Sequence, residues 1–391
     1  MKKYIKYLCI FLCLFASVSV GAVDFGLVLD QNASYENSSG FNYTGILIPR
    51  FSTLLGDSGR FNISAGINIQ SNPWIVVPEL LRTEFNWRFD SMELSAGRIP
   101  YSDPLGYIAN GLFDGAIFSV DTQVGTFSAG AWYTGLLYKK RINITMTQDE
   151  LLSHAVDLDY SDFYNSYFAS RRALAAFGWE HPALKEFINL RVSILGQFDF
   201  TGSGLHSQYL AAKVTVPIRD FVFDLGGCVE LIEDSGEFGI GLAGELGVAW
   251  MLPTRIEDRL SLLGRFSSGN FDDSAMCAFQ PLTTNPQGDM LQTKLSGVSI
   301  ISLAYLGRFH RTLSAGLSSS YYIGSDKNTN TIVGNEGFFW GLDFYGRLLW
   351  SPVSDIQLSL GGGIFLPALG NAAPDTDPRW RVELGLVISL Y

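Results

Sequence analysis

Residues 379–391 alternate between large apolar side chains and side chains that are mostly polar or small. The large apolar positions are Trp380, Val382, Leu384, Leu386, Ile388 and Leu390. Because successive side chains of a β-strand point to opposite faces, this period of two predicts a strand with one face against an apolar medium. Arg381 and Glu383 lie on the second face, and their charges favour a water-filled interior over a dry protein core.

The same alternation recurs upstream and reaches membrane length. Segment 338–350 has the outward set Phe338, Trp340, Leu342, Phe344, Gly346, Leu348 and Trp350. About ten residues at a rise of about 3.3 Å, tilted by about 40°, span roughly 25 Å, which is the height of the apolar band of a membrane barrel. We therefore expect Trp340, Trp350 and Trp380 to form part of the aromatic girdles. A soluble β-sandwich is the alternative, but it rarely places aromatic residues at both ends of strands with charges on the opposite face.

The first 22 residues have the pattern of a secretory signal peptide. Three lysines precede an apolar run over 7–20, and Gly21 and Ala22 supply small residues for cleavage. Residues 23–391 are then expected to form a single domain. No later run of 18 clean apolar residues appears, so the sequence does not predict a membrane-spanning helix.

Composition narrows the class of protein. The formal net charge is −11, and loss of the signal peptide removes three lysines, so an acidic mature chain argues against a nucleic-acid partner. Cys228 and Cys277 remain after cleavage and allow one optional disulfide. A secreted, alternating chain with 41 Gly and 28 Phe is typical of an all-β, transmembrane, antiparallel up-and-down barrel.

The spacing of turns predicts about eighteen strands, with sixteen as the alternative. We expect the first strand at 24–30, the seventh at 125–137, and turns centred at Gly307 and Pro352. Connections after even-numbered strands are short, whereas several after odd-numbered strands are long and polar. This asymmetry is typical of short periplasmic turns and longer outer loops, and it places both termini on the periplasmic side.

Two short motifs carry a resemblance to known families. Segment 383–390 resembles the C-terminal sorting signal of bacterial membrane barrels, except that Tyr391 stands one step past the usual aromatic position. Gly97-Arg98 followed by Asp114-Gly115 resembles the third-loop region of porins. The whole mature chain resembles a bacterial outer-membrane porin-type barrel. The resemblance implies contact with outer-membrane lipid, assembly by the barrel-assembly machinery through the C-terminal strand, and passive diffusion of small hydrophilic solutes. Monomer and homotrimer both stay open.

The pore-lining residues follow from the inward parity of each strand. Within 81–90, for example, Leu81 and Thr83 are predicted outward, and Arg82 and Glu84 inward. The expected lining or constriction residues are Arg82, Glu84, Arg88, Arg191, Lys213, Arg265, Asp343, Arg347, Arg381 and Glu383, with Asp103 and Asp114 from the third-loop region. Mixed charges on a low-dielectric wall set ion selectivity. The alternative for each residue is a neighbouring ion pair that merely solvates the lumen.

Two loops leave alternative roles open. The loop over 99–112 either folds into the pore, where Asp103 and Asp114 would oppose a basic wall, or caps the rim. The loop over 138–171 is expected to contain a short helix within 148–162, and it is either a gate or ligand platform or an exposed outer loop.

Catalysis and metal binding find little support in the sequence. Mature-chain histidines are His154, His181, His206 and His310, and none lies in a recognisable catalytic arrangement. Acidic pairs such as Asp157 and Asp159 lack the spacing of a calcium loop. We expect no cofactor and no enzyme. A channel for small hydrophilic solutes is the leading hypothesis. The alternatives are a non-conducting surface barrel whose loops act as an adhesin or ligand-binding surface, and a transporter for apolar substrates.

Overall fold

The computed structural model of the protein describes residues 20–270, 275–326 and 337–390. The predicted signal peptide therefore lies outside the described residues except for its last three positions, which form the start of the first strand. Among the described residues, no helix is both long enough and apolar enough to cross a membrane.

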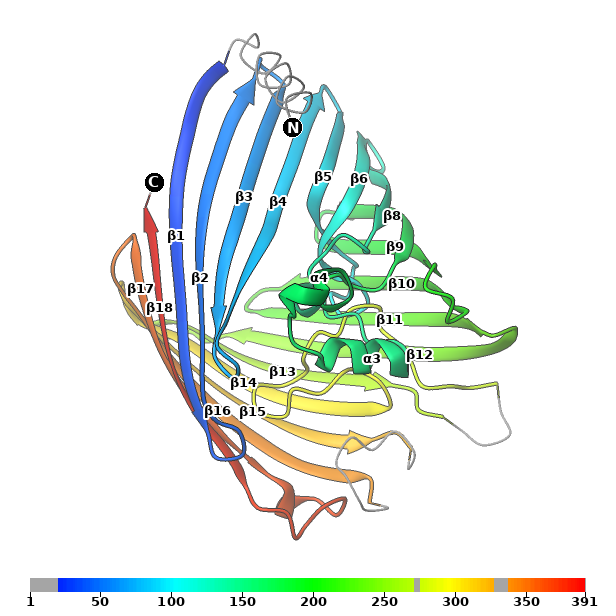
Figure 1. Cartoon of the computed structure of the whole chain (residues 1–391). Coiled ribbons are helices and arrows are strands. Elements are labelled where there is room, and N and C mark those ends of the chain that lie inside the picture. The colour runs from blue at the N-terminus through cyan, green and yellow to red at the C-terminus, as the bar shows by residue number, and fades with distance from the viewer. Residues whose placement is uncertain (1–19, 271–274, 327–336, 391) are drawn as a thin grey trace.

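Eighteen antiparallel strands form one sheet. The first nine are β1 (Val20–Glu36), β2 (Gly40–Leu55), β3 (Gly59–Gln70), β4 (Ile75–Phe89), β5 (Met92–Ser102), β6 (Asn110–Thr122), β7 (Gly125–Tyr133), β8 (Arg172–Leu184) and β9 (Ile188–Asp199). The rest are β10 (Leu205–Ile218), β11 (Phe221–Asp234), β12 (Glu237–Met251), β13 (Glu257–Ser267), β14 (Val298–His310), β15 (Leu313–Gly324), β16 (Phe339–Val353), β17 (Ile356–Leu366) and β18 (Arg379–Leu390). Each strand pairs with its sequence neighbours, and β18 pairs with β1, so the sheet closes into a barrel (Figure 1). The prediction of eighteen strands is confirmed.

Short helices lie in two of the connections. The β7–β8 loop contains α2 (Lys139–Ile142), α3 (Gln148–Ala155), a 3-10 turn η1 (Tyr160–Asp162) and α4 (Phe163–Tyr167). A second 3-10 turn, η2 (Pro367–Leu369), follows β17. The helix predicted within 148–162 is thus present, and it ends at Ala155.

The outer face of the barrel is apolar and has aromatic pairs at both rims. Near the rim of the β1–β2 connection, Tyr35 contacts Trp380 with ring centroids 5.6 Å apart, and Tyr43 contacts Trp74 at 5.7 Å. Near the opposite rim the ring of Phe221 stacks on that of Trp250 at 5.8 Å. Aromatic girdles at two heights enclose the apolar band that a bilayer requires.

The connections differ between the two rims, as the sequence predicted. Every connection after an even-numbered strand is short, whereas those after β7 and β13 run over 134–171 and 268–297. In the β7–β8 connection, α3 and α4 lie inside the outline of the wall (Figure 1).

Several predicted strand boundaries shift. The first strand continues to Glu36, because the polar residues after Asp30 remain paired with both neighbours. The seventh strand ends at Tyr133, where the chain turns into the barrel. The β14–β15 turn lies at 311–312 and the β16–β17 turn at 354–355, each beyond the residue predicted as its centre.

Candidate pore constriction

Three connections enter the barrel and meet one another. The β5–β6 loop, 103–109, contacts the β13–β14 loop through the N–H of Thr283, which donates to the carbonyl of Ile108 at 3.1 Å. The β7–β8 loop joins them through the Asn143 side chain, whose Nδ2 donates to the carbonyl of Thr284 at 2.9 Å. The sequence left open whether 99–112 enters the pore or caps the rim, and the structure places this loop inside.

The tip of the β5–β6 loop is organised by one buried carboxylate. Asp103 accepts hydrogen bonds from the backbone N–H groups of Leu105 and Gly106 through Oδ1, and from those of Ile108 and Ala109 through Oδ2, at 2.8–3.0 Å. Burial raises the pKa of Asp103, and the four donors oppose that shift by stabilising the anion. Asp103 therefore shapes the loop, and its carboxylate faces backbone donors of that loop instead of a basic wall.

Beyond this tip the loop reaches the opposite wall. The Tyr107 ring packs against the Phe279 ring with centroids 6.4 Å apart, and the Arg265 guanidinium of β13 lies 5.5 Å from the centre of the Tyr107 ring. Leu105 lies so close to β11 that a Cβ added to Gly226 would fall 2.4 Å from its Cδ2. The β5–β6 loop thus crosses the lumen.

The three loops share an apolar core with the inner wall. Its fully buried members include Tyr107, Phe113, Leu174, Leu195, Tyr209, Phe279, Leu282, Tyr322 and Trp340. Because burying such side chains is favourable and non-directional, this core holds the loops against β6–β16 and fills that side of the barrel.

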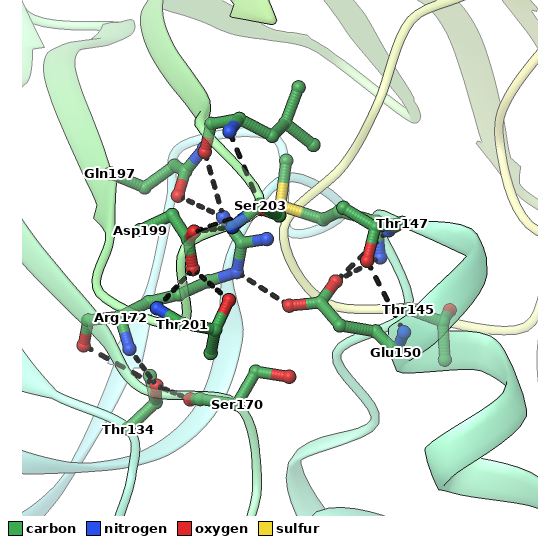
Figure 2. Close-up of polar contacts among 12 residues, drawn as sticks. Thr134, Thr145, Thr147, Glu150, Ser170, Arg172, Gln197, Asp199, Thr201 and Ser203 are labelled. Atoms are coloured by element: carbon green, nitrogen blue, oxygen red, sulfur yellow. Dashed lines mark hydrogen bonds and ion pairs between the residues drawn. The ribbon is translucent and has the colours of Figure 1, made fainter. Parts of the chain in front are cut away.

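An ionic anchor fixes α3 to the wall (Figure 2). Arg172 of β8 is fully buried, and its Nε donates to Oε1 of Glu150 at 2.8 Å. Its Nη1 donates to Oε1 of Gln197 at 2.6 Å and to the carbonyl of Leu205 at 3.1 Å. Glu150 also accepts from the N–H of Thr147 at 3.0 Å and closes a capping box at the start of α3. One glutamate therefore both begins the helix and attaches it to the barrel.

The side of the lumen left open by the loops is a cavity of about 870 Å³ along β1–β4. Its charged lining residues are Asp24, Arg50, Arg60, Arg82 and Arg141. The first four lie on the barrel wall, whereas Arg141 comes from α2. The cavity thus lies between the wall and the inserted loops.

The cavity lining carries more positive than negative charge. Arg82 forms an ion pair with Glu84, and Arg141 Nε lies 2.9 Å from Oε2 of Glu79. No ion pair is present for Arg50 or Arg60 among the residues that the structure describes. The four arginines carry four positive charges, and Glu79, Glu84 and Asp24 carry three negative charges. The cavity therefore has one net positive charge.

The sequence matches no model of a protein family, and no curated protein is similar to it in sequence. Solved structures do match in fold. OccK11 (OpdR) of Pseudomonas aeruginosa aligns with a TM-score of 0.61 and 12% identity, over 94% of this chain and 96% of that one. OprD of the same organism aligns at 0.59 and 11%, over 95% and 97%. OccK2 (OpdF), solved in complex with glucuronate, aligns at 0.63 and 11%, over 96% and 99%.

The chain has the fold of a bacterial outer-membrane porin. The likeness to these solved structures concerns the fold, and it extends over nearly the whole of each chain. At 11–12% sequence identity, these matches show the fold alone. The solute must be inferred from the side chains of this chain.

Many of the predicted lining residues form ion pairs or hydrogen bonds with neighbouring side chains of the barrel wall. Glu245 joins Lys213 at 2.7 Å and Arg265 at 3.3 Å, and Arg381 lies 3.7 Å from Glu383. Asp343 accepts from the Tyr322 hydroxyl at 2.5 Å and is fully buried. Arg191 approaches Glu180, and Arg88 pairs with Glu93, whereas Arg347 is exposed on the same face as Asp343. One of the twelve residues predicted to line or constrict the pore, Arg82, also lines the cavity along β1–β4.

Three orientations differ from the predictions. Asp114 does not oppose a basic wall; it accepts from Nε and Nη2 of Arg98 at 2.7 Å each. Trp340 is fully buried in the loop core, because a bulge between Tyr322 and Ile323 shifts the β15–β16 register. Trp350 and Trp380 are exposed as expected. Leu81 lines the cavity, because a bulge in the β3–β4 ladder turns it inward.

The sequence analysis did not single out Arg50, Arg60, Glu79 or Arg141 as lining residues. Arg50 and Arg60 follow the inward parity of their strands and could have been found by extending the same alternation to 46–60. Glu79 lies beyond the bulge at Leu81, and Arg141 is brought to the cavity by loop folding. Neither position has a periodic signal in the sequence.

The remaining sequence alternatives concern thiols and metals. Cys228 and Cys277 are both free. Among the residues that the structure describes, no three histidine, cysteine or acidic side chains gather closely enough to hold a metal ion.

Proposed function

We propose that the protein is an outer-membrane channel for small hydrophilic solutes, and that the arginine-lined cavity makes it selective for anions, small carboxylates in particular. The observation that carries this proposal is the set of four arginines and one aspartate around the open cavity. A guanidinium presents paired donors that match a carboxylate, and its charge attracts anions over the length of a narrow path.

The overall acidity of the chain does not oppose anion selectivity. Permeation depends on the local field inside a low-dielectric channel, where a few charged groups outweigh distant surface charges. Two structural neighbours support the solute class: OpdK was solved with vanillate and OccK2 with glucuronate, and both ligands are carboxylates. We also retain the proposal that residues 1–22 are a cleaved signal peptide.

The proposal is tested by single-channel recording in a planar bilayer under a potassium chloride gradient. We expect ohmic steps and a reversal potential on the chloride side. Replacing Arg50 and Arg60 by Gln should move the reversal potential towards the cation side. Arg88→Gln is the matched control, because Arg88 pairs with Glu93 at the β4–β5 turn and does not line the cavity.

Two outcomes count against this proposal. Cation selectivity that is unaffected by the double substitution removes the assigned role of the arginines. Correctly folded, heat-modifiable protein that inserts without conducting contradicts the channel itself, and it favours a surface barrel whose loops bind a ligand.

A further inference from the structure

The strand ladder of the barrel wall has a break between β4 and β5. These strands pair from Phe89 and Met92 up to Thr83 and Arg98. Above that point β5 continues to Ser102 along β6, while β4 continues from Arg82 to Ile75 along β3. Gly97 marks the divergence with φ of 113°, and a Cβ there would fall 1.9 Å from the Thr83 carbonyl oxygen. We call this break, flanked by 75–82 and 98–102, the seam.

Side chains close the seam where backbone pairing stops. The carbonyls of alternate residues on the free edge of β4 each accept one hydrogen bond. Val76 accepts from the Tyr160 hydroxyl, Pro78 from the Tyr167 hydroxyl at 2.9 Å, and Leu80 from Nη1 of Arg98. Proline at position 78 fits a free edge, because it has no N–H that would need a partner.

The seam lies at the height of the membrane. Trp74, which belongs to the aromatic girdle with Tyr43, stands two residues above Val76. The outward side chains of Val76 and Leu80 are exposed and apolar, and so are the two loop residues beside them, Leu136 and Tyr160. Unpaired backbone groups are costly in hydrocarbon, which explains why each free carbonyl accepts a side-chain hydrogen bond.

On the inner side, the arginine-lined cavity reaches the seam. Leu81, next to Leu80, and Leu112, two residues from Asp114, both line that cavity. Arg98 stands between the cavity and the lipid face, held by Asp114 and by the carbonyl of Leu136 at 3.0 Å. The lumen is thus separated from lipid here by side chains and not by a continuous backbone ladder.

We propose that the seam is a lateral path by which a single-chain amphipathic anion passes between the cavity and the membrane. The anionic head is held by the cavity arginines. The alkyl chain passes between Leu80 and Leu136 when Arg98 releases the carbonyls of these two residues. Tyr160 and Tyr167 release the neighbouring edge of β4 in the same opening. Side-chain hydrogen bonds break and re-form by rotamer changes, so the path opens without unpairing the strand ladder. The inference rests on the anion-binding cavity of the proposed function and adds a second entrance to it.

The test compares a locked seam with a locked ladder. In a Cys228→Ala, Cys277→Ala background, Val76→Cys and Tyr160→Cys are bridged by a bis-methanethiosulfonate linker about as long as the tyrosine that it replaces. The matched control bridges Ile69→Cys and Val76→Cys, which are directly opposite each other in the β3–β4 ladder. Methanesulfonate carries the current, and decanesulfonate, whose permanent charge prevents free flip-flop, is added as the amphipathic blocker.

Lateral entry predicts that bridging the seam slows the onset of decanesulfonate block by about tenfold or more, leaves methanesulfonate current unchanged, and is reversed by reduction. The ladder bridge should have no effect. A block that begins equally fast with the seam bridged shows entry through the mouths and overturns the proposal. So does a seam bridge that lowers both currents alike, because it then merely obstructs the pore.

A second variant covers failure of the bridged protein to fold. Tyr160→Phe with Tyr167→Phe keeps both rings and removes two seam hydrogen bonds, so it should speed the block by about tenfold; an unchanged rate contradicts the proposal. If no variant conducts methanesulfonate, the proposed channel function fails. Lateral entry is then tested by photolabelling with diazirine-tagged decanesulfonate. The label must reach Leu112 in protein with an unbridged seam and must not reach it once the seam is bridged.

Discussion

At the scale of single residues, Lys294 shows how charge holds the inserted loops together. Its Nζ donates to the carbonyl of Thr145 at 3.0 Å and to Oε1 of Gln280 at 2.9 Å, which joins the β7–β8 and β13–β14 loops. Burial lowers the pKa of Lys294 to about 8, and the attraction of Glu230 and Glu150 offsets part of this shift. Burial therefore disfavours the charged ammonium form of Lys294, even though its Nζ donates both of these hydrogen bonds.

This pKa predicts that the closed loops become more stable in alkali. A lysine on a released loop keeps a pKa near 10.4, so between pH 8 and about 10 the released state binds more protons than the closed state. The free energy of loop release should therefore rise with pH, by up to about 1.4 kcal/mol per unit in that window. Limited proteolysis at pH 7–10 measures loop release, and Lys294→Met should remove this contribution. An unchanged pH slope in that variant would assign the effect to other groups.

Residue orientation could be predicted wherever a strand stays in register. Lys213, Arg265 and Glu383 lie on the inner wall as their parity indicated. The prediction was wrong at Leu81 and Trp340, because one extra residue in a bulge reverses every orientation beyond it. Bulges leave little trace in the apolar alternation itself.

At the scale of elements, the position of α3 depends on the ion pair between Arg172 and Glu150. Arg172→Met should leave the Glu150 carboxylate buried without its cation and destabilise the closed β7–β8 loop by about 3–5 kcal/mol. Arg191→Met is the matched control. The Arg191 side chain is 40% exposed and lies 3.6 Å from Glu180, so its loss should cost about 0–1 kcal/mol.

The measurement for this prediction is current noise together with protease cleavage within 148–155. Arg172→Met should raise both, and adding Glu150→Gln should restore part of the closure, because glutamine keeps the capping box without the charge. Equal effects of Arg172→Met and the Arg191 control would show that α3 is held by apolar packing alone.

Strand elements could be predicted more fully than loop elements. Period-two alternation identified β3, β16 and β18 because half of each strand faces lipid. The inserted loops have no such constraint: their apolar residues pack against side chains from distant elements, as Phe279 does on Tyr107 of another loop and on Tyr209 of β10. Their presence in the lumen is a tertiary property that local sequence does not specify.

At the scale of the whole molecule, closure joins the two ends of the described chain. β18 forms ten residue pairs with β1 and ten with β17, so its loss would expose two sheet edges within the membrane, where unpaired backbone groups are not tolerated. A chain that starts at Val23 should refold in detergent to a heat-modifiable barrel, because it retains every pair between β1 and β18. Removal of 379–391, although shorter, should abolish the heat-modifiable form. If the heat-modifiable barrel instead forms without β18, then β17 must pair directly with β1. That result would show that the barrel can close with seventeen strands, and it would contradict this prediction.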